Sequence, residues 1–453
     1  MNQKSYLPLI ILLVVSFAAV FLPAVPTEIL TKGTFPDGKP WEISAGDTAW
    51  MLTATAFVLL MTPGLAYFYG GMVNMRNVIS TMLQSFVSMG VISVLWIVVG
   101  FSLAFGDSIG GFIGDPTTFF MFRNVLDAKA PWSLAPTIPL ALFAFFQLKF
   151  AIITPALITG SFAERVNFKG YVLFIVLFSL IVYSPLAHWT WHPEGFLFKL
   201  GVLDFAGGTV VHMSAGWAAL AAAIFLKKRK SMVENEVHPP ANIPFVLLGT
   251  GLLWFGWFGF NAGSAVGAGT LAVSAFATTN IAAAAAGLSW VLFDVAKGKK
   301  LSALGFCIGA VVGLVAITPA AGFVTIPTSI FIGTAAGIIS NIIAHWKAKS
   351  GKIDDTLDVF PCHGVGGMVG MVMTGIFATS AVNSAVVENG LAFGETALFL
   401  KHMLALVIVS VFAFVVSYIL LVVTNAIVPL RVSEEEERLG LDVSQHDEVL
   451  MEA

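Results

Sequence analysis

Long runs of apolar residues, separated by short polar segments, recur along the whole chain. A helix that crosses a membrane needs about 20 mostly apolar residues. Runs of that length lie near residues 48–70, 78–105, 137–162, 170–188, 206–226, 243–263, 268–293, 301–321, 326–346, 361–379 and 400–428. They are too long, and too rich in Gly and Ala, for the alternating segments of roughly ten residues that build a membrane β-barrel. The pattern therefore predicts an all-α membrane protein with eleven transmembrane helices.

The N-terminal segment has a related pattern. An apolar run over residues 7–25 follows Lys4, and small residues stand toward its end. A basic start, an apolar centre and small residues beyond are typical of a secretory signal peptide. We predict a signal peptide over residues 1–25, a membrane domain over 26–430 and a cytoplasmic tail over 431–453. An uncleaved twelfth helix is the alternative.

The basic residues between the runs lie mainly on one side of the predicted bundle. On that side lie Arg76, Arg165, Lys169, Lys227, Lys228, Arg229, Lys230, Lys297, Lys299, Lys300, Lys347, Lys349, Lys352, Arg431 and Arg438. On the other side lie Lys32, Lys39, Arg123, Lys129, Lys199 and Lys401. Because cytoplasmic loops are enriched in Lys and Arg, we predict that the mature N-terminus is outside and the tail inside, in a cell inner (plasma) membrane.

Composition excludes several function classes. Of the 453 residues, 57% are hydrophobic and only 11% are charged, whereas about 25% are charged in an ordinary soluble domain. A soluble enzyme is therefore excluded. The net charge of −3 gives no reason to expect a nucleic-acid partner. The only cysteines, Cys307 and Cys362, lack the spacing of a zinc site. No phosphate-binding Gly-x-x-x-x-Gly-Lys-Ser/Thr loop occurs, which excludes ATP-driven transport, and we predict no enzyme activity and no cofactor.

Few ionisable residues fall inside the runs, where a charge is costly and marks a functional site by default. They include Lys149, His212 and His363. The two histidines lie five runs apart, and each follows an aspartate, Asp204 or Asp358, that opens a helix. Two copies of five helices in opposite orientations would give this pattern. We therefore predict a 5+5 inverted repeat with both imidazoles between the halves; a lysine facing that path would repel a cation.

The surroundings of the histidines narrow the alternatives. Glycines flank both histidines at Gly207, Gly208, Gly364, Gly366, Gly367 and Gly370. Small residues let helix backbones approach closely, which favours a narrow lined path. Backbones that lie so close would leave too little space for a haem held by both imidazoles. We expect both aspartates to be helix caps, and Asp204 also to favour a cation nearby.

Several long motifs resemble the ammonium transporter family, which includes the Mep and Rhesus proteins. The matching segments are Phe68-Tyr-Gly-Gly, Gly160-Ser-Phe-Ala-Glu-Arg165, Asp204-Phe-Ala-Gly-Gly-Thr-Val-Val-His212, Gly256-Trp-Phe-Gly-Phe-Asn-Ala-Gly-Ser264, Ile317-Thr-Pro-Ala, Asp358-Val-Phe…His363-Gly and Val428-Pro-Leu-Arg-Val…Gly-Leu-Asp-Val443. The resemblance extends over about residues 46–446.

This resemblance implies roles for residues at the outer end of the path. Trp191, Ser264 and Phe150 are similar to the family's recruitment site, where ring faces and a hydroxyl hold an ammonium ion. Phe150 and Phe260 are similar to its paired phenyl gate. Asp204 is similar to a structural and electrostatic carboxylate near that site.

The resemblance also implies a pore and partners. His212 and His363 are similar to the twin histidines of a hydrophobic pore, and Thr318 to a threonine on the conduction path. The family forms homotrimers, and its tail often meets a PII-type signalling protein. We expect transport of ammonium or ammonia, with methylammonium as a further candidate. An ammonium sensor with little flux is one alternative, and a membrane redox subunit with a haem between the histidines is the other.

Overall fold

The computed structural model describes residues 7–21, 30–126, 130–236 and 238–450, which are mainly helical. The α-helices are α1 (Leu7–Phe21), α2 (Ala45–Met72), α3 (Val78–Leu95), α4 (Phe101–Phe105), α5 (Leu140–Phe162), α6 (Phe168–Phe178), α7 (Ser184–Trp191), α8 (Phe196–Leu200), α9 (Ser214–Leu226), α10 (Lys230–Val233), α11 (Ile243–Trp257), α12 (Thr270–Ala296), α13 (Ala303–Ile317), α14 (Ile326–Ser350), α15 (Gly366–Phe377), α16 (Ala397–Ile427), α17 (Glu434–Leu439) and α18 (Leu441–His446). Two short antiparallel pairs, β1 (Lys32–Thr34) with β2 (Pro40–Glu42) and β3 (Ser108–Ile109) with β4 (Ile113–Gly114), lie outside the bundle core.

Tighter and wider helical turns join several of these helices. The 3₁₀ turns are η2 (Met75–Asn77), η4 (Phe120–Phe122) and η9 (Leu391–Phe393). The π-helical turns are η3 (Trp96–Gly100), η5 (Ser179–Tyr183), η6 (Gly208–Met213), η7 (Phe258–Ala262) and η8 (Phe360–Val365). An α-helix adjoins both ends of these π-helical turns, with three exceptions: the start of η6, the start of η8 and the end of η7. Those three exceptions all lie in the candidate site below.

Ten helices in the described part of the chain are long and apolar enough to cross a membrane. They coincide with the predicted runs except for the run at 301–321, which forms the shorter helix α13 of 15 residues. Pro319 follows two residues after the end of α13, and a proline cannot continue a helix. The turns after α13 are buried, which is where non-helical backbone is tolerated at membrane depth. A crossing by this segment, and with it the count of eleven, stays a prediction.

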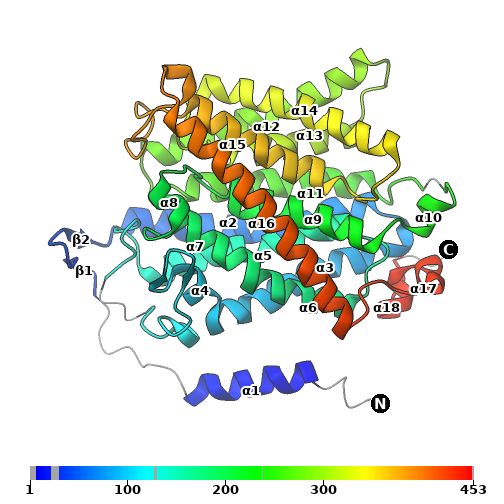
Figure 1. The fold of residues 1–453 in the computed structure, drawn as a ribbon, viewed down its shortest axis with the longest axis horizontal. Helices are drawn as coiled ribbons and strands as arrows, with labels where there is room; N and C mark the ends of the chain where they lie inside the picture. Colours follow the sequence, from blue (N-terminus) through cyan, green and yellow to red (C-terminus); the bar gives the residue numbers. More distant parts are fainter. Residues whose placement is uncertain (1–6, 22–29, 127–129, 237, 451–453) are drawn as a thin grey trace.

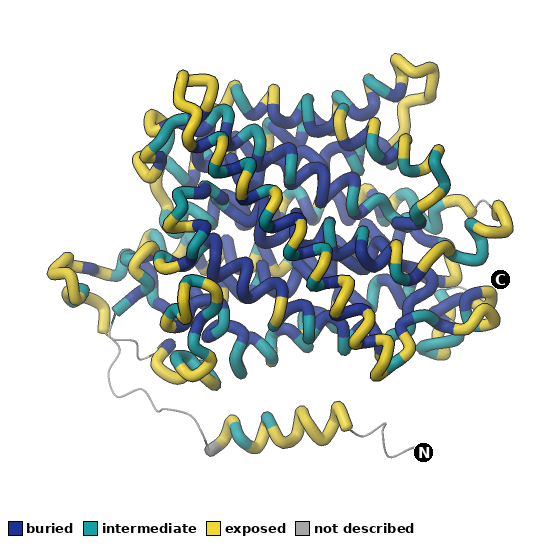
Figure 2. Tube along the Cα trace, viewed as in Figure 1, coloured by how far each residue is buried: buried dark blue, intermediate teal, exposed yellow. Residues whose placement is uncertain are grey.

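The helices pack side by side into one bundle (Figure 1). Helix α2 packs along α11, α12 packs against both α13 and α14, and α5 and α16 both pack against α9. Helix α16 crosses the front of the bundle diagonally, and many of its side chains are exposed there (Figures 1 and 2). Buried apolar residues from the long helices fill the interior, in two main clusters (Figure 2). Because these exposed positions are apolar, the outer surface suits hydrocarbon rather than water.

Helix α1 carries most of the apolar run predicted to be a signal peptide. The leucines and isoleucines of this helix are exposed, and Figure 2 shows the helix apart from the bundle. The basic residue before it and residues 22–29 after it lie outside the described residues. Cleavage after residue 25 therefore stays a prediction.

Candidate functional site

A cavity of about 120 Å³ lies at one end of the bundle and is lined mainly by aromatic rings. Trp191 at the end of α7, Phe150 in α5 and Ser264 after η7 all border it. The fold thus brings together the three residues that resembled a recruitment site. The Ser264 hydroxyl donates to the carbonyl of Phe260 at 2.8 Å, which leaves its oxygen lone pairs available to another donor. We call this space the aromatic cavity.

The ring of Phe150 forms the floor of the aromatic cavity, and the ring of Phe260 lies against it. The rings of Phe150 and Phe260 lie 4.2 Å apart between centroids, with 33° between their planes. Trp191 meets Phe150 edge-on, at 5.8 Å and 82°. Phe150 borders the cavity but Phe260 does not, and both are fully buried. A cation leaving the cavity in this direction would have to part the two rings.

The two predicted histidines meet beyond this floor. The His212 ring lies 5.9 Å from that of Phe260, and its Nδ1 lies 3.3 Å from the Nδ1 of His363. The two imidazole rings are nearly parallel, with 5.4 Å between centroids and 22° between planes. The exposed fractions of the two residues are 1% and 3%. A continuous series of ring contacts therefore runs from Trp191 to His363.

The local backbone explains how the imidazoles come so close. His212, Phe260 and His363 each lie in a π-helical turn, η6, η7 and η8 respectively, and such turns recur at functional sites. A Cβ atom added to Gly216, one turn after His212, would lie 2.2 Å from the Cα of Gly364. A residue with a Cβ at position 216 would therefore hold the two segments further apart.

The hydrogen bonds of the histidines are coupled. Because a neutral imidazole has one donor and one acceptor nitrogen, one of the two Nδ1 atoms must donate to the other. The Nε2 of His212 is buried and has no hydrogen-bond partner among the described residues. The direct contact leaves no space between the two rings for a haem.

Trp257 connects the histidine pair to Thr318. Its ring stacks on His212, with 5.3 Å between centroids and 16° between planes. Its Nε1 donates to the Thr318 Oγ1 at 2.9 Å, and the Thr318 hydroxyl donates to the carbonyl of Leu314 at 2.7 Å. A hydrogen bond to Trp257 therefore links Thr318 to the series of contacting rings.

The carboxylate of Asp204 holds the beginning of η6. Its Oδ1 accepts the backbone N–H of Gly207 at 2.8 Å and of Gly208 at 2.7 Å. Its Oδ2 accepts both the backbone N–H of Thr209, at 2.7 Å, and the Thr209 hydroxyl. Trp191 Nε1 donates to the Asp204 carbonyl at 3.0 Å. Asp204 does not border the aromatic cavity, so its carboxylate faces the helix start rather than the cavity.

The other histidine helix is capped by a different residue than expected. The N–H groups of Val359 and Phe360 donate to the two carboxylate oxygens of Asp355, at 3.1 and 2.8 Å. Asp358, the expected cap, forms an ion pair with Lys347 at 2.7 Å instead. Asp358 has a positive φ of 57°, which turns the chain between the cap and the helix. The expectation for Asp358 was wrong for this reason.

Lys149 does not border the aromatic cavity. Its Nζ lies 5.9 Å from the centre of the Phe145 ring, one helical turn earlier in α5. Phe145 is one of the exposed apolar residues, so this pair lies on the outer side of α5. The cation repulsion considered for a pore-facing lysine therefore does not arise.

The structure adds residues that the sequence analysis did not assign to the site. Gln147 borders the aromatic cavity, is 8% exposed, and its Oε1 is buried without a hydrogen-bond partner among the described residues. Phe146 and Trp132 also border the cavity. Gln147 and Phe146 stand three and four residues before Phe150, and that spacing places them on the same helix face. Helical periodicity could have identified these two; nothing in the sequence pointed to Trp132.

The C-terminal tail binds the opposite end of the bundle. The Asp442 carboxylate accepts the backbone N–H groups of Ile79 and Ser80 at 3.0 and 2.7 Å, so it caps the first turn of α3. The N–H of Leu441 donates to the Asn77 side chain at 2.8 Å. Helix α17 begins with a reciprocal cap between Ser433 and Glu436. The tail is therefore an ordered part of the fold.

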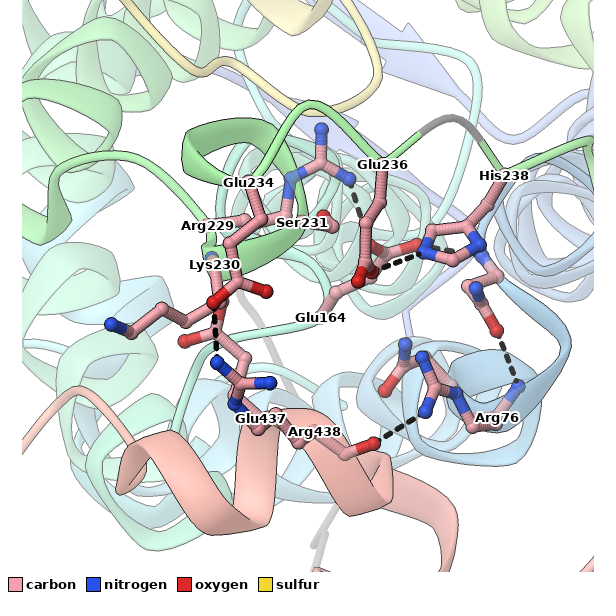
Figure 3. A pocket seen from close by; sticks show the side chains of 12 residues that line it. Arg76, Glu164, Arg229, Lys230, Ser231, Glu234, Glu236, His238, Glu437 and Arg438 are labelled. Carbon is pink, nitrogen blue, oxygen red and sulfur yellow. Dashed lines mark hydrogen bonds and ion pairs between the residues drawn. The ribbon is translucent and has the colours of Figure 1, made fainter.

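Charged residues from the tail and the membrane domain surround a small polar cavity of about 150 Å³ (Figure 3). Arg229 pairs with Glu164 at 2.8 Å, while Arg438 of α17 pairs with Glu234. Arg76 donates to the carbonyl of Arg438. Each guanidinium group thus has a partner, and the cavity is a junction that ties the tail to two loops of the membrane domain.

We predict that tail binding weakens as the pH falls below 6.5. Burial lowers the pKa of His446 below its ordinary value of 6.5, against the opposite effect of Asp442 and Glu448. A released tail therefore takes up a proton at a higher pH than a bound tail does, so acid favours release. Hydrogen–deuterium exchange of residues 441–446 should rise by roughly twofold relative to the His446→Gln variant between pH 7 and pH 5.5.

The His446→Gln variant measured at each pH removes the intrinsic pH dependence of exchange. Burial also raises the pKa of Asp442 above 3.8, and this acts in the opposite direction at lower pH. A wild-type exchange rate that stays in constant ratio to that of the variant would contradict the prediction.

Comparisons with known proteins match nearly the whole chain. Residues 49–451 match the profile described as the Ammonium Transporter Family. The chain is 45% identical over 409 residues to the ammonium transporter of Bacillus subtilis, covering 89% of this chain and 98% of that protein. It is 43% identical over 407 residues to ammonium transporter Amt1 of Archaeoglobus fulgidus, covering 90% and 99%. The crystal structure of Saccharomyces cerevisiae Mep2 matches with a TM-score of 0.81 and 36% identity, over 87% of this chain and 88% of that one.

Proposed function

The chain belongs to the ammonium transporter family, and on that premise we propose that it selects ammonium by deprotonation. The ion is held in the aromatic cavity, loses a proton next to the histidine pair, and crosses the apolar segment as ammonia. The observation that carries the proposal is the unbroken series of ring contacts from Trp191 to His363, with a bare imidazole nitrogen on His212.

Recruitment rests on weak cation binding by several groups together. An aromatic face attracts a cation by roughly 0.5–2 kcal/mol, and Trp191 and Phe150 supply such faces. Ammonium also donates directed hydrogen bonds, unlike potassium. Ser264 and Gln147 both border the cavity, and the Ser264 hydroxyl and the unpartnered Gln147 Oε1 can accept such bonds. The cavity therefore favours ammonium among ions of similar size and charge.

Selectivity rests on the dry path below the cavity. Moving a bare ion from water into an apolar interior costs far more free energy than its attraction to the ring faces supplies. Ammonium avoids this cost because one N–H bond can break. The proton passes to the Nε2 of His212, and ammonia, which is neutral, continues. Potassium has no proton to lose and stays outside.

The contact between the histidines offers the proton a way onward. When His212 gains a proton at Nε2, its Nδ1–H can pass to the Nδ1 of His363, 3.3 Å away. His212 then returns to a neutral tautomer, so no charge need remain on it. A relay of this kind is within the ordinary chemistry of imidazole. Thr318 supports the pair through Trp257, and Asp204 holds the backbone of η6 that carries His212.

The proposal is tested by charge displacement in liposomes that contain the protein. An ammonium pulse should give a transient current, and an equal potassium pulse should give none. A potassium current of similar size would contradict selective transport. No current from either ion, with no uptake of labelled methylammonium, would favour the sensor alternative. A strong visible absorption band in the purified protein would favour the haem alternative.

We predict that Gln147→Leu weakens ammonium binding without closing the path. The substitution removes one acceptor from the aromatic cavity, and a hydrogen bond to a charged group contributes about 1.5–3 kcal/mol. The half-saturating ammonium concentration should rise by about tenfold, while the maximal current stays close to that of the wild type. Current measured over a range of ammonium concentrations gives both values.

Lys149→Leu is the matched control, since it alters the same helix two residues away on its outer side. Its half-saturating concentration should stay within about twofold of the wild type. Equal effects of the two substitutions would mean that Gln147 acts through the stability of α5 rather than through the cavity.

The arrangement of the whole protein is also a proposal. We propose a homotrimer in the inner (plasma) membrane, with the aromatic cavity outside and the tail in the cytoplasm. The basic loop residues support this orientation, and the ordered tail supports a binding face for a PII-type protein. Native mass spectrometry would give the number of subunits. Binding of a purified PII-type protein to inside-out vesicles, and not to right-side-out vesicles, would support both the partner and the orientation.

A further inference from the structure

A broad groove of about 1010 Å³ opens beside the tail, at the end of α9. Its walls come from the last turn of α9, the loop that follows it, the segment after α14 and the first residues of the tail. None of the residues assigned above to the ammonium path borders this groove. The groove is therefore a separate feature that the transport proposal leaves without a role.

Five of the thirteen residues that border the groove are basic. Those that border it are Lys227, Lys228, Lys230, Lys352 and Arg431. Lys230 pairs with Glu434 at 2.8 Å and Arg431 pairs with Glu437 at 2.8 Å. Lys227, Lys228 and Lys352 are exposed, and within the described part of the chain they form no ion pair. The groove therefore has three ammonium groups available to an anion.

The acidic residues of the groove do not cancel this charge. The carboxylate of Asp354 is held by the Arg229 guanidinium through bonds of 2.9 and 3.0 Å. Burial by itself would raise the pKa of Asp354, but the neighbouring Arg165 and Arg229 guanidinium groups lower it overall, so the carboxylate stays ionised and paired. Glu434 is taken up by Lys230. The remaining charge is positive.

Arg431 fixes the shape of the lysine loop. Its guanidinium donates to the carbonyl of Leu226 at 2.6 Å and to the carbonyl of Lys228 at 2.8 Å. Lys227 has a positive φ of 62°, a conformation that a non-glycine residue adopts at a cost. The chain therefore turns sharply at the end of α9, and the backbone that carries Lys227 and Lys228 is held in one place.

The other side of the groove is apolar, and exposed apolar side chains also lie on the neighbouring helix α16. Ile224 and Val233 border the groove and are exposed, at 42% and 57%. Helix α16, which packs against α9, carries a strip of exposed apolar side chains at Val407, Val411, Val415, Ile419, Val423 and Ile427. This strip ends four residues before Arg431. A ligand with a long apolar part and an anionic head would match both features.

We propose that this groove binds an anionic phospholipid, with the lipid phosphate among Lys227, Lys228 and Lys352 and an acyl chain along α16. Basic residues next to the ends of membrane helices attract anionic lipids, and lysine stems cover apolar surface while their charged ends remain polar. A free phosphate ion would use the lysines but not the apolar wall. A zwitterionic lipid would use the wall but not the net charge.

The test places a fluorophore in the groove. Val233→Cys is labelled in the full-length protein; Cys307 and Cys362 are both buried, so the label goes to the groove. Brominated phosphatidylglycerol should quench the fluorophore at about one tenth of the concentration that brominated phosphatidylcholine requires, given three lysines near the phosphate. Adding Lys227→Gln, Lys228→Gln and Lys352→Gln should remove that preference.

A matched control carries the same loss of charge elsewhere on the same side, as Lys297→Gln, Lys300→Gln and Lys349→Gln. It should keep the tenfold preference. Equal quenching by both lipids in the wild-type groove, or an equal loss in the control, would overturn the proposal. Displacement by glycerol 3-phosphate at the same concentration as the lipid would overturn it in favour of a free phosphate site. Because the readout does not depend on transport, failure here leaves the ammonium proposal untouched.

Discussion

Replacing His212 with aspartate is expected to admit potassium to the pathway. In the wild-type protein, the rings that contact His212 belong to Trp257, Phe260 and His363, and aromatic and imidazole rings do not compensate a bare cation. A fixed carboxylate would supply the missing negative charge and draw in an ion with its water. The potassium current should rise from background to at least about one tenth of the ammonium current.

The measurement is charge displacement in liposomes, with separate ammonium and potassium pulses for each variant. His212→Gln is the control, because it removes the imidazole and adds no charge. It should lower the ammonium current and still exclude potassium. His363→Asp should behave as His212→Asp does, since the two imidazoles are in contact. A His212→Asp variant that excludes potassium as well as the wild type does would remove the histidines from the selectivity mechanism.

Asp204→Ala is expected to lower the free energy of unfolding so far that little folded protein remains. The carboxylate accepts three backbone N–H groups and one hydroxyl at the start of η6. An alanine leaves these buried donors without partners, and each unsatisfied donor costs about 1–3 kcal/mol. The free energy of unfolding should therefore fall by about 4 kcal/mol or more. We expect a strongly lowered unfolding temperature, poor recovery from the membrane and no ammonium current.

Two further variants separate structure from electrostatics. Asp204→Asn keeps one acceptor oxygen and should recover part of the thermal stability. Asp358→Ala, at the aspartate before the other histidine, removes an ion pair with Lys347 but no helix cap, so its unfolding temperature should fall much less than that of Asp204→Ala. If Asp204→Ala instead unfolded at the wild-type temperature and only raised the half-saturating ammonium concentration, Asp204 would act by attracting the ion.

The sequence by itself determined the class of protein and predicted a set of candidate site residues. Ten predicted runs coincide with helices long enough to cross a membrane, because hydropathy reports the preference of each segment for water or hydrocarbon and needs no partner. The family resemblance assigned Trp191, Phe150 and Ser264 to one recruitment site, and all three residues border one cavity. The positions of the helices do not test the inverted repeat or the signal peptide, and both stay predictions.

Only the tertiary structure decided which groups touch. The imidazoles touch where the backbone at Gly216 lies against Gly364 of a distant segment, with no room for a Cβ at position 216. The cap of the second histidine helix is Asp355 rather than Asp358, because a positive φ at Asp358 turns it toward Lys347. Hydropathy could not show that Lys149 lies on the outer side of α5. These outcomes depend on pairs of residues far apart in the chain, and a single sequence records the preference of each residue but not the partner that packing gives it.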